Sequence, residues 1–156
     1  TRSGALPAVD LMDLCYSGKW TRDEMYKRIT KSGGFVDHLG TSDAIEVNEM
    51  IAKGDKYAKL IYDAFQYQIA KEIGAMAVVL KGKVDAIVLT GGISHDKGLV
   101  ANLTEQVGWI APIEVRAGEF EMEALAAGGC RVLAGEEQAK VYTGEKVFTN
   151  FDYLKQ

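Results

Sequence analysis

The residues best placed to bind a ligand form a glycine turn between a predicted strand and a predicted helix. The turn reads Leu89-Thr90-Gly91-Gly92-Ile93-Ser94. Ligands of open α/β sheets bind beyond the carboxyl ends of the strands, and two glycines there let a ligand lie against the backbone. The N–H groups at the start of the next helix favour an anion or a polar ring at the same place. The spacing is neither a dinucleotide fingerprint nor a Walker loop, and a tight turn that needs glycine for its geometry alone explains it equally well.

Three acidic residues follow the next predicted strand, namely Glu119, Glu121 and Glu123. Because parallel strands end at the same edge of a sheet, we expect these carboxylates near the crevice that holds the glycine turn. Acidic residues at a helix start are also ordinary partners of the helix dipole, and composition alone favours that interpretation. If a phosphate binds beside these carboxylates, a cation must bridge the negative charges, and Mg²⁺ is the usual one.

The remaining reactive side chains give weaker signals. Arg2 is predicted, from its position alone, to be a solvated arginine in a frayed segment. His38 and His95 lack a partner at ligand spacing and are predicted to be structural or surface residues. Cys15 and Cys130 fit neither a disulfide framework nor a metal motif, which indicates a reducing compartment and favours the cytoplasm.

The composition is that of one globular domain. The chain has 156 residues, 47% of them hydrophobic, and a net charge of -4, which excludes a disordered chain. No apolar run approaches the roughly 20 residues of a membrane span. With 18 Lys and Arg residues against 22 Asp and Glu residues, nucleic-acid binding is disfavoured. Because the chain opens without Met, we expect a processed product or part of a longer protein.

Periodicity and capping signals predict a helix-rich chain with one short strand–helix–strand unit. Thr21 with Glu24 has the spacing of a capping box, Asp43 with Glu46 repeats it, and Asp55 caps the next helix. The predicted helices cover about 7–17, 22–32, 44–53, 56–81, 95–107 and 119–134, with strands at 84–89 and 111–115 and one or two helical turns within 136–142. The aromatic and apolar residues of the tail are expected to pack back onto the surface: Phe148, Phe151, Tyr153 and Leu154.

The helix predicted over 56–81 is the longest element. Its apolar residues keep a spacing of three and four, and its first half has a polar face that includes Lys59, Asp63 and Gln66. Its second half, 73–80, is apolar nearly all round, so we expect it to be covered on most sides by a sheet or a partner, and a homodimer or larger homo-oligomer is favoured.

Two parallel strands are too few to form a covered sheet. Either further strands lie in weak segments such as 34–39, or the rest of the sheet belongs to a part of the protein outside this sequence.

Several longer phrases carry a resemblance to a known family. They are Thr1-Arg2-Ser3-Gly4, Gly33-Gly34, and the segments 39–43, 67–76, 84–93 and 121–126. With them the chain resembles, to about Tyr142, the C-terminal part of butyrate kinases, within the acetate and butyrate kinase family of actin-like phosphotransferases. The resemblance implies an α/β fold, a helix-rich partial actin-like ATPase (ribonuclease H-like) domain with a short parallel βαβ unit.

The resemblance also implies an activity. Such enzymes transfer the γ-phosphoryl group of ATP, reversibly, to a short-chain fatty acid, giving ADP and an acyl phosphate, with Mg²⁺ as cofactor. Residues 1–156 would be the C-terminal, nucleotide-side domain, without the first domain and the leading strands. The acid itself is left open among butyrate, isobutyrate, propionate and branched acids.

Site residues follow from the same resemblance, position by position. Arg2 would face the transferring phosphoryl group, Asp43 would belong to the adenine and ribose pocket, and Glu123 would help to hold Mg²⁺. The adenosine-side loop would consist of Gly91, Gly92, Ile93 and Ser94. One departure is Ile45, where the family commonly has an arginine that can lie flat on adenine, so nucleotide affinity or preference is in question.

Two other functions stay open beside the kinase. The chain could be a non-catalytic nucleotide-binding or homodimer assembly module, with its long apolar helix as the interface. A different actin-like sugar kinase is a weaker alternative, because Arg2 and Glu123 match the acyl kinases.

Overall fold

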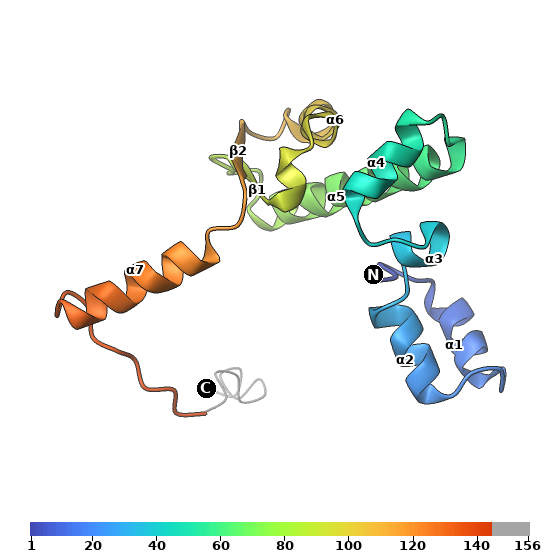
Figure 1. Ribbon diagram of the computed structural model, residues 1–156, viewed down its shortest axis with the longest axis horizontal. Helices are drawn as coiled ribbons and strands as arrows, with labels where there is room; N and C mark the ends of the chain where they lie inside the picture. The colour runs from blue at the N-terminus through green and yellow to red at the C-terminus, as the bar shows by residue number, and fades with distance from the viewer. Residues whose placement is uncertain (145–156) are drawn as a thin grey trace. The chain divides into compact units, whose positions relative to one another are not determined.

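The computed structural model describes residues 1–144, and these divide after Gly118 into two compact units, residues 1–118 and 119–144. Each unit is described by itself. The first holds helices α1 (Ala8–Tyr16), α2 (Arg22–Thr30), α3 (Phe35–Leu39), α4 (Ala44–Ala52), α5 (Lys56–Val79) and α6 (Lys97–Val107), strands β1 (Ile87–Gly91) and β2 (Ile113–Ala117), and the 3₁₀ helix η1 (Gly92–His95) (Figure 1).

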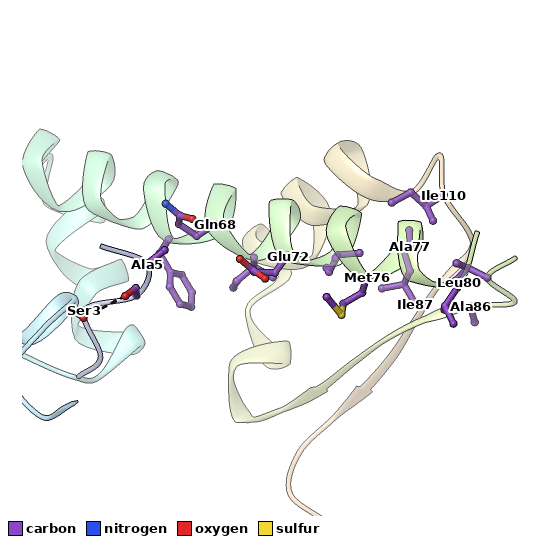
Figure 2. A pocket seen from close by; sticks show the side chains of 15 residues that line it. Ser3, Ala5, Gln68, Glu72, Met76, Ala77, Leu80, Ala86, Ile87 and Ile110 are labelled. Atoms are coloured by element: carbon purple, nitrogen blue, oxygen red, sulfur yellow. Dashed lines mark hydrogen bonds between the residues drawn. The ribbon is translucent and has the colours of Figure 1, made fainter. Parts of the chain in front are cut away.

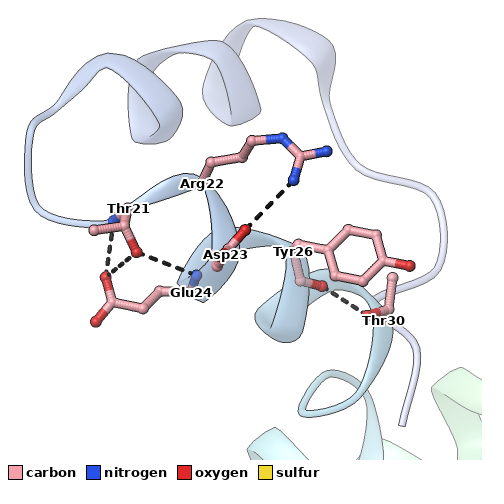
Figure 3. Close-up of polar contacts among 6 residues, drawn as sticks. All are labelled: Thr21, Arg22, Asp23, Glu24, Tyr26 and Thr30. Carbon is pink, nitrogen blue, oxygen red and sulfur yellow. Dashed lines mark hydrogen bonds and ion pairs between the residues drawn. The ribbon is translucent and has the colours of Figure 1, made fainter.

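The predicted caps set the starts of the helices. Thr21 Oγ1 accepts from the N–H of Glu24 at 3.3 Å, and the Glu24 carboxylate accepts from the N–H of Thr21 at 2.8 Å, which completes the capping box of α2 (Figure 3). Asp55 accepts from the N–H groups of Tyr57 and Ala58 at the start of α5. These side-chain acceptors satisfy backbone donors that the first turn of a helix leaves without partners.

The core lies where α4 and α6 pack against α5. Figure 1 shows α4 alongside α5, and the largest fully buried side chains are Val47 of α4 with Leu99 and Leu103 of α6. Residues at a spacing of three and four bring one apolar stripe of each helix to this contact. The core therefore sits on one side of α5 only.

The prediction for the faces of α5 was wrong. Its buried residues are Ala58, Tyr62, Gln66 and Ala70, so Gln66, assigned to the polar face, is 4% exposed. Within residues 1–144 much of the apolar second half of the helix is exposed, with Met76 at 57% and Val79 at 70%, and its cover by a partner stays a prediction. The physical reason is that α4 and α6 pack on the 58–62–66–70 stripe, while Ile69 and Ile73 are only partly buried against the core.

The predicted parallel strand–helix–strand unit is present. β1 pairs with β2 in parallel, with Ile87 opposite Ile113 and Gly91 opposite Ala117. Both strands start and end later than predicted, and their pairing continues to Gly91 opposite Ala117. The prediction of a strand buried on both faces was wrong, since Val88 is 55% exposed in the described structure.

Two short segments also differ from prediction. Residues 34–39, considered as a hidden strand, form helix α3 after Gly34, whose φ of 60° is open to glycine but strained for other residues. The second unit contains α7 (Glu121–Leu133), and residues 136–142 are not helical. The packing predicted for Phe148, Phe151, Tyr153 and Leu154 lies outside the described residues. Among residues 1–144, no helix has both the length and the apolar character to cross a membrane.

We expect Leu103→Ala to lower the free energy of unfolding by about 2–5 kcal/mol, because Leu103 is 1% exposed and its removal leaves a cavity between α5 and α6. The matched control is Leu133→Ala on α7, where the leucine is 90% exposed and the change should stay within about 0.5 kcal/mol. Urea unfolding of both variants measures the difference, and equal losses would contradict this location of the core.

Candidate functional site

Different structural constraints act on the two glycines of the turn. Gly91 ends β1 with φ 82°, and its carbonyl accepts a hydrogen bond from the N–H of Gly118 at 3.2 Å. Gly92 opens η1 with φ outside the left-handed region, and a methyl group added there would meet no protein atom within 4 Å. Turn geometry therefore explains Gly91, whereas the fold itself does not require glycine at 92. The space over Gly92 is free for a ligand to lie against the backbone.

The side chains of Ile93 and Ser94 anchor the turn to the protein interior. Ser94 is 5% exposed and its hydroxyl donates to the carbonyl of Thr90 at 2.8 Å. Ile93 packs against the buried core cluster. A ligand on this turn would meet the backbone of these two residues, because their side chains are used inside the protein.

Asp96 fixes the turn to three helices. Its Oδ1 accepts from the N–H groups of Gly98 and Leu99, at 2.8 and 3.1 Å, and so caps α6. Its Oδ2 accepts from the Tyr62 hydroxyl of α5 at 2.5 Å and from the Asn48 amide of α4 at 2.8 Å. One carboxylate therefore joins α4, α5 and α6 directly after the glycine turn, and sequence reasoning did not single it out. The available signal was an Asp placed just before the helical periodicity of α6.

The protonation of this group follows from its contacts. Burial raises the pKa of the Asp96 carboxyl, but the hydrogen bonds from Tyr62, Asn48 and the two backbone N–H groups outweigh it and hold the pKa below its usual value. Burial, followed by the hydrogen bond to Asp96, raises the pKa of the Tyr62 phenol. At neutral pH the pair is a neutral phenol donating to a carboxylate.

Asp43 caps α4, and its Oδ1 accepts from the N–H of Ile45 at 2.8 Å. It is exposed, and Ile45 beside it is 69% exposed. Asn48 lies between one and two turns further along the same helix and bonds Asp96. The hydrogen bond between Asn48 and Asp96 thus connects the helix that carries Asp43 to the end of the glycine turn.

The segment that carries Arg2 is held in place. The N–H of Ser3 donates to the carbonyl of Ile29 at 3.0 Å, and the N–H of Gly33 donates to the carbonyl of Thr1 at 2.9 Å. The frayed backbone expected for Arg2 was therefore wrong, while its side chain is exposed as expected. The residue lines a cavity of about 500 Å³ together with His38 and Gln68. His38 itself is hydrogen bonded through Nδ1 to the hydroxyl of Tyr57 at 2.8 Å.

A larger cavity, of about 610 Å³, runs along α5 (Figure 2). Figure 2 shows Ser3 and Ala5 toward one end and Met76 and Leu80 toward the other. Its lining is mostly apolar, with Glu72 as its charged side chain, and it does not include the glycine turn. Such a lining does not suit a polyphosphate, so we do not assign the nucleotide to this cavity.

Glu119, Glu121 and Glu123 belong to the second unit, and Glu121 and Glu123 lie in the first turn of α7. In the described part of the chain, no group of three or more His, Cys, Asp or Glu side chains is arranged to hold a metal ion. A single carboxylate still fits Mg²⁺, which binds proteins through one or two carboxylates and takes its other ligands from water and phosphates. The expected proximity of Glu123 to the glycine turn stays a prediction.

Comparison with known proteins decides the family. The sequence profile of the Acetokinase family matches residues 1–143. The chain belongs to the acetokinase family. It is 53% identical over 141 residues to "Probable butyrate kinase 2" of Caldanaerobacter subterraneus subsp. tengcongensis. That match covers 90% of this chain and 40% of the relative, so this acetokinase-family chain spans less than half the length of the protein it matches.

Solved structures agree with the family. The crystal structure of Porphyromonas gingivalis acetate kinase matches with a TM-score of 0.76 at 21% identity, over 85% of this chain and 40% of that one. A propionate kinase from Francisella tularensis subsp. tularensis matches with a TM-score of 0.66 at 25% identity, over 76% of this chain and 36% of that one. These likenesses confirm the predicted helix-rich, partial actin-like ATPase domain with a short parallel sheet.

We expect Tyr62→Phe to lower the free energy of unfolding of this acetokinase-family chain by about 1–3 kcal/mol at pH 7, because the Asp96 carboxylate loses a donor. The lowered pKa of Asp96 means that its contribution to stability is present above the usual pKa and is lost as the pH falls through the folded-state pKa. The difference between wild type and variant should therefore shrink in acid. Tyr67→Phe, on the exposed side of α5, is the control. A pH-independent loss in urea unfolding would contradict the role of ionised Asp96.

Proposed function

We propose that this chain is the C-terminal, nucleotide-side part of a longer carboxylate kinase. The enzyme would transfer the γ-phosphoryl group of ATP, reversibly, to a short-chain fatty acid such as butyrate. Membership of the acetokinase family and the 53% identity to a probable butyrate kinase support it. The structural observation that carries it is the free backbone surface at Gly92, held by the Asp96 hydrogen bonds.

The adenosine side of ATP would lie on this surface. Gly91 and Gly92 expose backbone, and the exposed Asp43 on the linked helix α4 offers a carboxylate acceptor to ribose hydroxyl groups. Ile45 offers the base an apolar contact in place of a stacking guanidinium. ADP would occupy the same place after transfer.

Arg2 would act on the phosphoryl group. In phosphoryl transfer the protein mainly positions the groups and neutralises charge, and here an oxygen of the fatty acid carboxylate attacks phosphorus in line while ADP leaves. A guanidinium beside the equatorial oxygens stabilises the charge they carry. Among residues 1–144, no hydrogen bond or ion pair engages the Arg2 side chain, which leaves its donors for a substrate.

Glu123 would help to hold Mg²⁺. When bound, the ion would neutralise part of the charge on the nucleotide phosphates. Glu123 would supply one carboxylate ligand from the first turn of α7.

A second candidate function is a non-catalytic assembly module. One observation favours it: the exposed apolar side chains at the end of α5, which are Met76, Val78, Val79 and Leu80. A longer kinase accounts for the same residues, because other parts of that protein would cover them. Nucleotide binding separates the two candidates.

We expect calorimetric titration of the 156-residue chain to detect Mg-ATP binding, and Gly92→Val to weaken it by at least about tenfold, which is a loss of about 1.4 kcal/mol. The valine side chain enters the space over Gly92 without meeting protein atoms near its Cβ. Gly129→Val on α7, whose added Cβ also meets nothing within 4 Å, is the control and should bind as the parent does. Absence of binding by the parent would favour the assembly module.

We expect Glu123→Gln, made in the full-length kinase, to raise the Mg²⁺ concentration needed for half-maximal acyl phosphate formation by at least about tenfold. The neutral amide keeps the shape of the side chain and removes the charge that attracts the cation. Glu121→Gln, in the same turn of α7, is the matched control. Equal Mg²⁺ requirements in the two variants would remove Glu123 from the metal site.

A further inference from the structure

The Gly33-Gly34 pair lies directly against the backbone of Arg2. A methyl group added to Gly33 would lie 2.7 Å from the nitrogen of Ser3 and 2.9 Å from the carbonyl carbon of Arg2. One added to Gly34 would lie 2.8 Å from the carbonyl oxygen of Arg2. The neighbours are backbone atoms, so they cannot turn aside as a flexible side chain does. Either methyl group would push the Arg2 backbone away.

Hydrogen bonds hold the two segments at this distance. The N–H of Gly33 donates to the Thr1 carbonyl at 2.9 Å, and the N–H of Ser3 donates to the carbonyl of Ile29, at the end of α2, at 3.0 Å. Arg2 is thus flanked on both sides by bonded residues. The Arg2 side chain is exposed, and its guanidinium has no hydrogen bond or ion pair with another residue of the described structure. The position of the side chain therefore depends on the position of the Arg2 backbone.

Backbone conformation alone does not explain both glycines. Gly34 has φ 60°, which favours glycine, but Gly33 lies outside the left-handed region, and another residue could adopt its backbone angles. A residue with a side chain at position 33 would, however, prevent the backbone of Arg2 and Ser3 from approaching so closely. The close approach is therefore a separate constraint, and it acts on the segment of Arg2.

We propose that Gly33 and Gly34 are positioning residues that hold Arg2 at the transferring phosphoryl group. The role of Arg2 in this inference rests on the proposed function. The close contact of Gly33 and Gly34 with the Arg2 backbone rests on the structure alone. Because misplacing a catalytic group by about 1 Å can cost about 100-fold in rate, a single methyl group added at Gly33 or Gly34 is enough to impair phosphoryl transfer.

The experiment uses the full-length kinase and a double-mutant cycle. Gly33→Ala should lower kcat for acyl phosphate formation by about 100-fold while KM for ATP stays within about twofold, because the adenosine side is untouched. Arg2→Ala should lower kcat as well. The double variant should be no slower than Arg2→Ala alone, since the methyl group acts through the arginine.

Gly34→Ala is the second variant, and Gly18→Ala is its matched control. Gly18 has φ 71°, close to that of Gly34, but an added methyl group meets nothing within 4 Å. Both variants place a methyl group at a positive φ, which favours glycine, and only the methyl group at position 34 also meets the Arg2 backbone. Only Gly34→Ala should lower kcat.

Amide hydrogen exchange gives a readout that is independent of activity. The amides of Ser3 and Gly33 should lose protection in Gly33→Ala and keep it in Gly18→Ala. If the wild-type enzyme transfers no phosphoryl group but the exchange pattern is as expected, the contact of Gly33 with the Arg2 segment is supported and the proposed function fails. Unchanged kcat in Gly33→Ala, or losses that multiply in the double variant, would overturn the positioning role even where the kinase is active.

Discussion

A single carboxylate holds the candidate nucleotide site together. Asp96 accepts hydrogen bonds from Tyr62 and Asn48 on one oxygen and from the first turn of α6 on the other. The geometry of the glycine turn depends on it, because Asp96 joins the end of the turn to α4, α5 and α6, whereas the turn itself is anchored by the side chains of Ser94 and of the partly buried Leu89 and Ile93. Without this acceptor a phenol and an amide would lose their shared partner in a partly buried contact, which costs more than an ordinary hydrogen bond is worth.

The two ends of the proposed reaction rest on different physical devices. Charge-assisted hydrogen bonds around Asp96 hold the proposed adenosine side, whereas close backbone approach at Gly33 and Gly34 holds the proposed phosphoryl side. The first device depends on protonation and the second does not. Acid that protonates Asp96 should therefore weaken the first device and leave the second unchanged.

Local signals in the sequence were sufficient where the structure is decided locally. The Thr21–Glu24 capping box, the Asp55 cap and the parallel strand pair were predicted and are present. The candidate residues Arg2, Asp43 and Glu123 came from the resemblance, and their roles remain proposals. Asp96 was missed because its importance comes from Tyr62 and Asn48, which are 34 and 48 residues away in sequence.

Predictions failed where the outcome depends on what packs on an element. Apolar spacing identified α5 but not the face that is buried, because Leu60, at 60% exposed, and Tyr62, at 4%, belong to equally plausible stripes. Residues 34–39 became a helix because Gly34 turns the chain with a positive φ and a strand would have to start there without a neighbour to pair with. Neither fact is visible in a window of a few residues.

The two-stranded sheet has a consequence for the chain in solution. In the described part, β1 and β2 pair only with each other, so each has one edge of backbone N–H and C=O groups without a strand partner. Unpaired edges beside exposed apolar side chains such as Val88 are templates for adding a strand from another molecule. Strand addition at these edges would make the 156-residue chain self-associate, and its apparent size would then grow with concentration.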